Sequence, residues 1–591
     1  MALTCSLGTR VSDGGRSVVM IFKGGTEMYH KTYKKGTGQQ SRLALLGKLG
    51  LMTGVVTLSL AACGSTNSSA STSTKATPAS TQLTIEGNTA PATVNNLNPY
   101  NGQFGVDLMY NSLMLVDPIN GTMSPELATS FKAVNSTTLE FTLRKGVKWS
   151  NGTPFTPADV VFTFDMLKKY PALDGGGVWN QLSSVTASGD TIIFKLSVPD
   201  VPLNLSLASV PIVSQAVWSK VANPVTYTAT SPVVTGPYTF GSFAPTKTVF
   251  KKNPLSFEAS DVKPQTVAFL VGSASQSTNE LLVANDTYDF SFNYFPDVQR
   301  TFVARNPKYN KYWFPAGGVV GLFMNLTSAP FNNPNFRRGI SYAINRNTVE
   351  NKALFGVEQV APQTGLVLPG QLSWADPAIP NDGMITQNDQ TALKYFKLAG
   401  YSQKNGKLVN SAGQQVSFSI MVPNNYSDWV AAAQEISSEL GKVGMNVTLN
   451  EPTAAVYTTN TQSGLFQAAM GSFGGSGNAY STFNPLLNSS FAAPIKSIAV
   501  SNWGRFKSAA VDRELAKLAA ATTNSAMIKA TYPLQEVMYT QAPVIDLYYG
   551  GMWGLYSTKH WVGWPSAKNP YTLPATWDDD LLAILMHVRP A

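Results

Sequence analysis

The sequence is poor in the residue types that build metal centres, disulfide frameworks and strongly charged surfaces. Its 591 residues include two cysteines and three histidines, and charged residues make up 13% of the chain. Soluble domains usually contain about 25% charged residues, so we expect a polar surface built largely from Ser, Thr, Asn and Gln. His560 and His587 lie near one end and His30 near the other, which is a poor basis for a metal site. We therefore predict no metal and no cofactor.

Signatures of common catalytic sites are also missing. The chain has no GxxxxGK[ST] phosphate loop, no HExxH helix and no GxSxG nucleophile elbow. The glycine-rich stretch 471–477 lacks the lysine of a phosphate cradle, and we interpret it as a loop whose backbone approaches another group closely. The acidic run 578–580 could chelate a cation, but we expect a solvated acidic turn. These absences favour a binding protein over an enzyme.

The positive charge is concentrated at the N-terminus. Residues 1–62 contain eight Lys or Arg and two acids, 8 − 2 = +6, which leaves +3 of the net +9 for the remaining chain. A nearly neutral body is not the electrostatic footprint of a nucleic-acid-binding protein. We therefore predict no nucleic-acid partner.

An apolar stretch near the N-terminus predicts export. Residues 49–62 form a 14-residue apolar run, shorter than the roughly 20 residues that span a bilayer but typical of a signal peptide. The run ends in LAAC at 60–63 and resembles a bacterial lipobox, which implies lipidation of Cys63 after cleavage. We predict a leader at 1–62, with the true start at either Met1 or Met28. The Ser/Thr-rich stretch 63–82 should then be a flexible tether.

The body mixes strands with helices. Alternating apolar residues predict strands at 83–85, 138–144, 191–196, 416–422, 446–450 and 544–549. Helices are expected at 106–115, 156–169, 335–354, 389–399, 428–443, 511–521 and 525–542. The mixture indicates α/β lobes, and about 510 residues are ample for large cores.

Several motifs occur in a fixed order along this body. They are LMLVD at 113–117, SPELA at 124–128, FTLRKGVKW at 141–149, NGTPFTPADVVF at 151–162, TGPY at 235–238 and FNNPNFRRGISYAINR at 331–346. Together they resemble the signature of bacterial extracellular solute-binding proteins of family 5. That family contains dipeptide, oligopeptide, nickel and oligosaccharide receptors of ABC importers.

The resemblance implies a two-lobed periplasmic-binding-protein-like fold, type II, with an extra subdomain and a two-segment hinge. Lobe I would comprise 83–318 plus 545–591, with a subdomain inserted at about 110–230, and lobe II would comprise 319–544. Crossover strands near 319–325 and 544–549 would form the hinge. The protein would work as a monomer on the outer face of the cell membrane, or in a periplasm if an outer membrane exists. It would close on a solute and deliver it to an ABC permease.

The resemblance leaves the ligand open between an oligopeptide and an oligosaccharide. Peptide receptors of the family usually place an Asp that grips the ligand amine in a stretch that aligns here with 470–480, which contains no carboxylate. We therefore expect contacts from aromatic and neutral polar groups. The candidates are Trp179, Asn325, Phe473, Trp503 and Tyr549. Trp149, Trp218, Trp429 and Trp553 could also supply aromatic platforms. A surface-anchored enzyme or an adhesin is the remote alternative.

Overall fold

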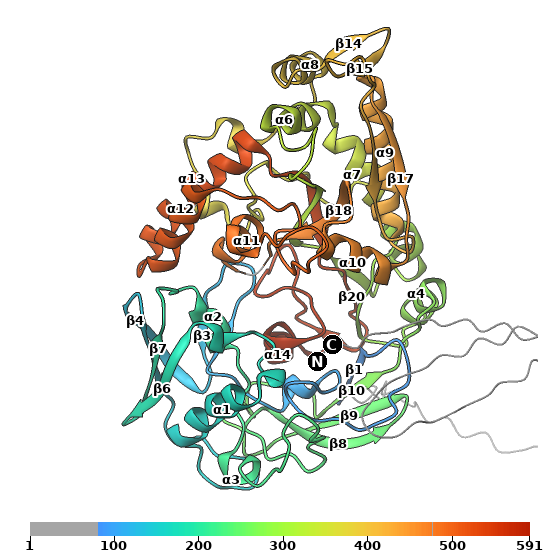
Figure 1. Cartoon of the computed structure of the whole chain (residues 1–591). Coiled ribbons are helices and arrows are strands. Elements are labelled where there is room, and N and C mark those ends of the chain that lie inside the picture. The colour runs from blue at the N-terminus through green and yellow to red at the C-terminus, as the bar shows by residue number, and fades with distance from the viewer. Residues whose placement is uncertain (1–80, 476) are drawn as a thin grey trace, which may run out of the picture. The chain divides into compact units, whose positions relative to one another are not determined.

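The structure is a computed structural model that describes residues 81–475 and 477–591, which belong to one compact unit. The predicted leader, Cys63 and nearly all of the tether lie outside the described residues. Within them the fold is mixed α/β, as predicted. Three larger sheets organise it, of seven, five and four strands (Figure 1).

The seven-stranded sheet combines residues from both ends of the described chain. Its order is β12-β20-β11-β1-β10-β9-β8. The strands are β1 (Gln82–Glu86), β8 (Tyr238–Ala244), β9 (Lys247–Lys252), β10 (Thr266–Leu270), β11 (Phe290–Phe292), β12 (Asn310–Trp313) and β20 (Gly554–Ser557). β1 is parallel to both of its neighbours, β10 and β11, so three carboxyl ends meet at one edge of the sheet.

The five-stranded sheet has the order β17-β16-β18-β13-β19. Its strands are β13 (Ala316–Met324), β16 (Ser417–Met421), β17 (Asn446–Asn450), β18 (Ala468–Phe473) and β19 (Val544–Gly551). Most of its core residues are fully buried, including Leu322, Ile420, Met470 and Ile545. Helix α9 (Ser427–Lys442) follows β16 and lies along β17 (Figure 1).

The remaining elements surround these sheets. The four-stranded sheet β4-β5-β7-β6 lies within the predicted inserted subdomain; its strands are β4 (Ala128–Asn135), β5 (Thr138–Leu143), β6 (Leu182–Ser188) and β7 (Thr191–Leu196). Two-stranded sheets pair β2 (Met114–Val116) with β3 (Met123–Pro125), β14 (Ser402–Lys404) with β15 (Lys407–Val409), and β21 (Trp561–Val562) with β22 (Arg589–Pro590). The helices are α1 (Pro157–Lys169), α2 (Leu203–Ala208), α3 (Gln215–Trp218), α4 (Gln276–Ala284), α5 (Val298–Thr301), α6 (Pro334–Ala343), α7 (Arg346–Leu354), α8 (Asp389–Leu398), α10 (Ala454–Ser463), α11 (Tyr480–Leu487), α12 (Ala509–Ala520), α13 (Asn524–Gln541) and α14 (Asp578–His587). Short 3-10 turns complete the list: η1 (Val106–Leu108), η2 (Pro171–Leu173), η3 (Val178–Asn180), η4 (Val303–Arg305), η5 (Leu372–Trp374), η6 (Pro380–Gly383) and η7 (Ser489–Phe491).

Two expected helices differ from the structure. Residues 106–115 do not form one helix, because the chain makes the single turn η1 and then enters strand β2. The stretch 335–354 is two helices, since Ile344 is extended and the Asn345 side chain caps α7 by accepting a hydrogen bond from Thr348 N at 3.2 Å. An Asn cap of this kind satisfies a free backbone donor at the start of a helix.

Two short connections join the seven-stranded and five-stranded sheets. Residues 314–315 link β12 to β13, and residues 552–553 link β19 to β20. β13 and β19 pair side by side in antiparallel fashion, so the two crossings are adjacent. β19 pairs within the five-stranded sheet as far as Gly551, so the chain returns to the seven-stranded sheet after residue 551 and not at the expected 545.

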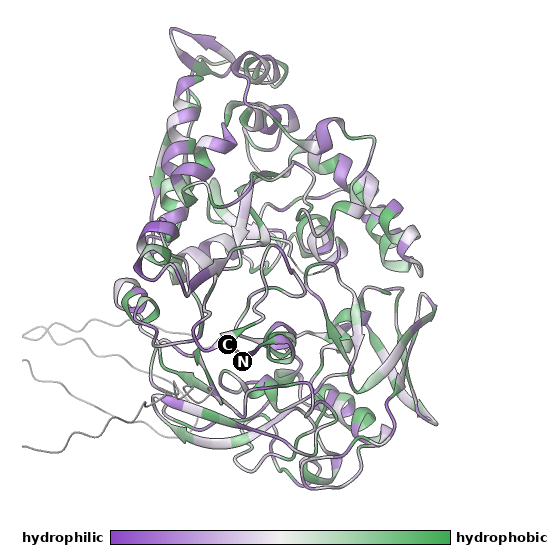
Figure 2. Cartoon of the chain, turned by 180° about the vertical axis from the view of Figure 1, so that it is seen from behind, coloured by the Kyte–Doolittle hydropathy of each residue, from purple (hydrophilic) through white to green (hydrophobic). Residues whose placement is uncertain are grey.

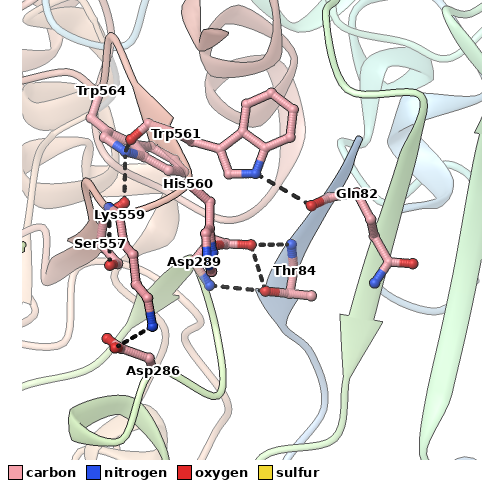
Figure 3. Close-up of polar contacts among 9 residues, drawn as sticks. All are labelled: Gln82, Thr84, Asp286, Asp289, Ser557, Lys559, His560, Trp561 and Trp564. Atoms are coloured by element: carbon pink, nitrogen blue, oxygen red, sulfur yellow. Dashed lines mark hydrogen bonds and ion pairs between the residues drawn. The ribbon is translucent and has the colours of Figure 1, made fainter. Parts of the chain in front are cut away.

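Residues near the C-terminus, His560 and Trp561, are hydrogen-bonded to strand β1 directly or through Asp289 (Figure 3). The Asp289 carboxylate accepts hydrogen bonds from Thr84 N at 2.8 Å and Thr84 Oγ1 at 2.7 Å, and His560 Nδ1 lies 3.1 Å from its other oxygen. The Trp561 indole donates to the Gln82 carbonyl at 3.3 Å. Segments about 480 positions apart in the sequence therefore brace one sheet.

Among the described residues, none of the helices combines the length and apolar character needed to cross a bilayer. Helices drawn by hydropathy carry both hydrophobic and hydrophilic residues (Figure 2). Their mixed character is typical of helices that bury one face and solvate the other.

Candidate functional site

The parallel strands of the seven-stranded sheet direct their following loops into a cavity. Thr89 follows β1, Ser273 and Ala274 follow β10, and Asn293 and Tyr294 follow β11; all five line it. Ligands of open α/β sheets bind outside the carboxyl ends of parallel strands. The strand order therefore places a binding site where the cavity lies.

The opposite wall comes from the five-stranded sheet. Residues of β13, β18 and β19 contribute, together with the start of α9 and Met552 and Trp553 in the second connection. The cavity has a volume of about 940 Å³, within the range typical of small-molecule sites. It thus lies between the two sheets that the short connections join.

Aromatic side chains dominate the apolar lining of this first cavity. They are Tyr294, Tyr426, Trp429, Phe473, Tyr548 and Trp553. Trp553 contacts Tyr294 edge-on at 5.1 Å between ring centroids, and Trp429 contacts Tyr426 at 5.2 Å. The Tyr294 hydroxyl donates to the Ala353 carbonyl of α7 at 2.9 Å, which joins the two walls. Aromatic faces of this kind bind apolar or sugar surfaces while their polar edges remain free to bond.

Neutral polar groups complete the lining of the first cavity. They are mainly the amides of Asn279, Asn293 and Asn425 and the hydroxyls of Ser273, Ser427 and Ser472. Asp428 is the one ionisable carboxyl among the described residues of this lining, and burial raises its pKa. The buried Tyr548 hydroxyl has no hydrogen-bond partner among the described residues.

A second cavity of about 600 Å³ adjoins the first, and both are lined by Gly317 and Met552. Its lining is acidic: Asp107, Glu126, Asp578, Asp579 and Asp580. Burial raises the pKa of Asp107, Asp579 and Asp580 to about 7 in each case. None of the described residues lining either cavity is Lys, Arg or His.

The acidic run 578–580 is only in part the solvated turn that we expected, because Asp578 is exposed but Asp580 is buried. It forms the first turn of α14, and Asp580 is only 7% exposed, accepting hydrogen bonds from Thr572 Oγ1 and Leu573 N on one oxygen. Carboxylates are favourable at a helix N-terminus, which explains their place in the sequence. Among the described residues, no group of three or more His, Cys, Asp or Glu side chains is arranged to hold a metal ion.

The structure brings only part of the predicted set to the first cavity. Phe473 lines it, and Trp503 lines a neighbouring 170 Å³ hollow that Phe473 also borders. The Asn325 amide is used internally: it donates to Gly464 O and Phe466 O and accepts from Thr327. The Tyr549 hydroxyl accepts from Leu368 N and donates to Leu366 O.

Trp179 lies away from both cavities. It packs on the core that surrounds the four-stranded sheet, and its indole donates to Phe164 O at 2.7 Å. Lys168 Nζ lies over the ring at 4.4 Å from its centroid. These contacts give Trp179 a packing role.

Sequence reasoning missed Tyr548, and it named Trp429 and Trp553 only among the wider set of possible aromatic platforms, of which these two line the first cavity. Tyr548 and Tyr549 are neighbours on β19, and side chains alternate between the two faces of a strand. Tyr549, the predicted contact, therefore points away from the cavity that Tyr548 lines. Trp553 lies two residues after the end of β19, and Trp429 lies in the first turn of α9, the helix that follows β16. Their position after a strand was the available signal.

Comparison with known proteins gives the class. Residues 122–493 match the family model described as bacterial extracellular solute-binding proteins, family 5. The chain belongs to this family.

Relatives and solved structures agree with this membership. A probable ABC transporter periplasmic-binding protein, SapA, of Escherichia coli is 24% identical over 393 residues, covering 60% of this chain and 68% of that protein. The peptidoglycan-binding protein YepA of Agrobacterium fabrum is 25% identical over 375 residues, covering 52% of this chain and 58% of that protein. A periplasmic oligopeptide-binding protein of Thermotoga maritima superimposes with a TM-score of 0.78 at 25% identity, covering 86% of this chain and 99% of that one. Its mannohexaose-bound structure gives a TM-score of 0.70 at 26% identity, with coverages of 86% and 98%.

Proposed function

We propose that this chain is the lipid-anchored receptor of an ABC importer, which captures an extended, mainly uncharged oligomeric solute between two closing lobes and delivers it to a membrane permease. We favour an oligosaccharide as the solute. The observation that carries this choice is the first cavity, lined by six aromatic side chains and by neutral amides and hydroxyls. Such linings suit ligands that have both apolar faces and hydroxyl groups. The mannohexaose-bound relative supports the same choice.

An oligopeptide is the second candidate. Asp428 at the start of α9 offers a carboxylate to the first cavity, although the stretch 470–480 offers none. A buried ligand ammonium needs such a partner to offset its desolvation. We further infer that the chain acts by binding and not by catalysis.

A ligand screen tests the choice between these classes. Mannohexaose and cello- and xylo-oligosaccharides would be compared with a free tripeptide and its N-acetylated form by thermal shift and calorimetry. A ligand bound only by the folded state raises apparent stability by about 2.7 kcal/mol at a concentration of 100 Kd. Tight binding of the free tripeptide with rejection of the acetylated one would establish an amine clamp and end the oligosaccharide proposal.

Lobe closure is tested by small-angle scattering. The two short connections at 314–315 and 552–553 are natural hinge positions, since a few residues between rigid elements absorb such motions. We expect a smaller radius of gyration with saturating ligand. An unchanged radius would contradict closure once an already closed empty state has been excluded by comparing both curves with the structure.

Lipid anchoring depends on the predicted acylated residue, Cys63. Cys63→Ser should leave the precursor uncleaved or release a soluble form, because acylation of the thiol precedes cleavage. Detergent partitioning and the intact mass of the mature chain give the answer, with Cys5→Ser, at the other cysteine of the sequence, as the matched control in protein expressed from Met1. The lipid anchor would be contradicted if the Cys63→Ser variant enters the detergent phase as the wild type does and its mature mass differs only by the substitution.

A further inference from the structure

A buried carboxylate stands directly behind two amides of the first cavity. Glu86, the last residue of β1, is 7% exposed. One of its oxygens accepts a hydrogen bond from Asn279 Nδ2 and the other from Asn293 Nδ2. Asn279 Nδ2 also donates to Asn293 Oδ1 at 2.7 Å, and Asn279 Oδ1 accepts from Ser273 N at 3.1 Å. The three side chains form a closed network.

An ionised carboxylate accepts hydrogen bonds and cannot donate them, so it dictates which way both amides point. Both N–H bonds of Asn279 are used inside the network, and one N–H of Asn293 is used. What remains for a ligand is one N–H of Asn293 and the second lone pair of each carbonyl oxygen. Acceptors therefore outnumber donors on this part of the cavity wall.

Burial raises the pKa of the Glu86 carboxyl, and the hydrogen bonds from Asn279 and Asn293 oppose this shift by stabilising the ionised form. Among the described residues, Glu86 forms no ion pair, and neither Lys, Arg nor His lines the adjoining cavity. The loop after β10 closes tightly on it, because a Cβ at Gly272 would lie 2.8 Å from Glu86 Oε1 and 3.1 Å from Asn279 Oδ1. A negative charge held at low dielectric acts on nearby ligand groups more strongly than it would in water.

We propose that Glu86 is a positioning and selectivity residue: it fixes the Asn279 and Asn293 amides so that this wall accepts hydroxyl or amino hydrogens and rejects ligand carboxylates. The proposal deepens the proposed function and rests on it for the identity of the cavity as the solute site. It sharpens the ligand class to neutral or cationic solutes.

The test uses matched probe pairs that differ by one carboxylate. Mannohexaose is compared with its C1-oxidised acid, and trialanine amide with trialanine. Like charges brought together at a binding surface are strongly disfavoured. We therefore expect the wild type to bind the probe without the carboxylate more tightly than its partner, by roughly tenfold or more in Kd. Glu86→Gln should reduce that preference by roughly tenfold, because a side-chain amide carries no charge and releases the orientation of its partners.

Asp289→Asn is the matched control. It makes the same carboxylate-to-amide change at a buried site that binds β1 at Thr84, two residues from Glu86 (Figure 3), and it does not line the cavity. Asp289→Asn should leave the preference within about twofold of the wild type. A purely structural effect would change both variants alike.

The double variant Glu86→Gln with Asn293→Asp separates positioning from stability. It exchanges amide and carboxylate, so every hydrogen bond of the network can form again, but the charge now lines the cavity. Thermal stability should return toward that of the wild type while rejection of the acidic probes becomes stronger than in the wild type. An unchanged preference in Glu86→Gln, or equal probe preferences in the double variant and the Gln variant, would overturn the proposal.

A ligand-independent measurement covers the case in which neither probe pair binds. That result would refute the proposed solute classes, whereas the network can still be observed through the side-chain amide resonances of Asn279 and Asn293 in protein labelled with ¹⁵N-asparagine. These resonances should shift and exchange faster with solvent in Glu86→Gln but not in Asp289→Asn. Unchanged resonances would show that Glu86 does not hold the amides, and the proposal would fall.

Discussion

The two adjoining cavities share Gly317 and Met552 but differ in chemistry. Among the residues that the structure describes, the first has aromatic and amide walls with one carboxylate, whereas five carboxylates and no Lys, Arg or His line the second. The difference follows from the elements that build each wall. Loops at the ends of parallel strands form much of the first cavity, while the second lies at the N-terminus of α14, where acids are favoured by the helix itself. One cleft can thus combine a contact surface for a ligand with a region whose charge is sensitive to pH.

The largest expected effect concerns the aromatic wall of the first cavity. Trp429→Ala removes the aromatic ring that would contact the ligand, so the binding free energy of mannohexaose should weaken by about 1–3 kcal/mol. Trp179→Ala is the control, because Trp179 packs away from both cavities and its loss should lower stability but not affinity. Calorimetry and thermal unfolding of both variants give the two readouts. Equal losses of affinity in Trp429→Ala and Trp179→Ala would show that the first cavity is not the site where mannohexaose binds.

The acidic cavity should make stability fall as pH rises. An unfolded Asp titrates near pH 3.9, whereas burial raises the pKa of Asp580 to about 7, so the folded state favours the protonated form. The stability that this preference contributes is fully present below about pH 4 and is lost as pH rises through about 7. Asp580→Asn keeps one carbonyl oxygen for Thr572 and Leu573 and removes the charge.

We therefore expect Asp580→Asn to raise the unfolding free energy at pH 8 by about 1–3 kcal/mol and to change it little at pH 4. Urea unfolding at both pH values measures the difference. Asp512→Asn on the outer helix α12 provides an ionisable Asp away from both cavities as a control. A gain of the same size at both pH values would mean that packing, and not ionisation, is responsible.

The smallest expected effect separates neighbouring tyrosines on β19. Tyr549→Phe leaves Leu368 N and Leu366 O without their partner and should cost about 1–2 kcal/mol of stability, with no loss of mannohexaose affinity. Tyr548→Phe removes a buried hydroxyl that has no partner, so stability should stay level or rise by up to about 1 kcal/mol. Affinity should fall only for Tyr548→Phe. The reverse pattern would place the wrong face of β19 at the cavity.

Local patterns predicted most elements because the physics that forms them is local. The stretch 428–443 became α9 and 544–549 became β19, each within about two residues at its ends. The helix expected at 156–169 became α1, with Thr156 as its N-cap, and the Asp159 carboxylate accepts a hydrogen bond from Thr156 N at 2.8 Å. The expected helix at 106–115 is reduced to the turn η1, and its last two residues instead pair in strand β2 with β3 across the Asn120-Gly121 turn.

The cavity was less predictable because it depends on which loops meet in space. Phe473 was identified from its position in a family motif, whereas Glu86, Asn279 and Asn293 come from three separate segments and no spacing links them. Tyr549 lies in β19 as expected and Asn325 directly follows the end of β13, but both side chains hydrogen-bond inside the protein. The sequence predicted that the acids at 578–580 face solvent, because nothing in it shows the cavity that they line beside α14.

The backbone of Gly475 lies so close to that of Gly317 that substitutions at these positions are restricted. The φ of Gly475 is +93°, and a Cβ there would lie 1.8 Å from the Gly317 carbonyl oxygen, at the point where both cavities meet. No side chain fits such a gap without moving the main chain. A library designed to give this scaffold new ligands should therefore keep both glycines and vary the aromatic and amide positions around them. Natural drift in ligand preference would follow the same restricted set of positions.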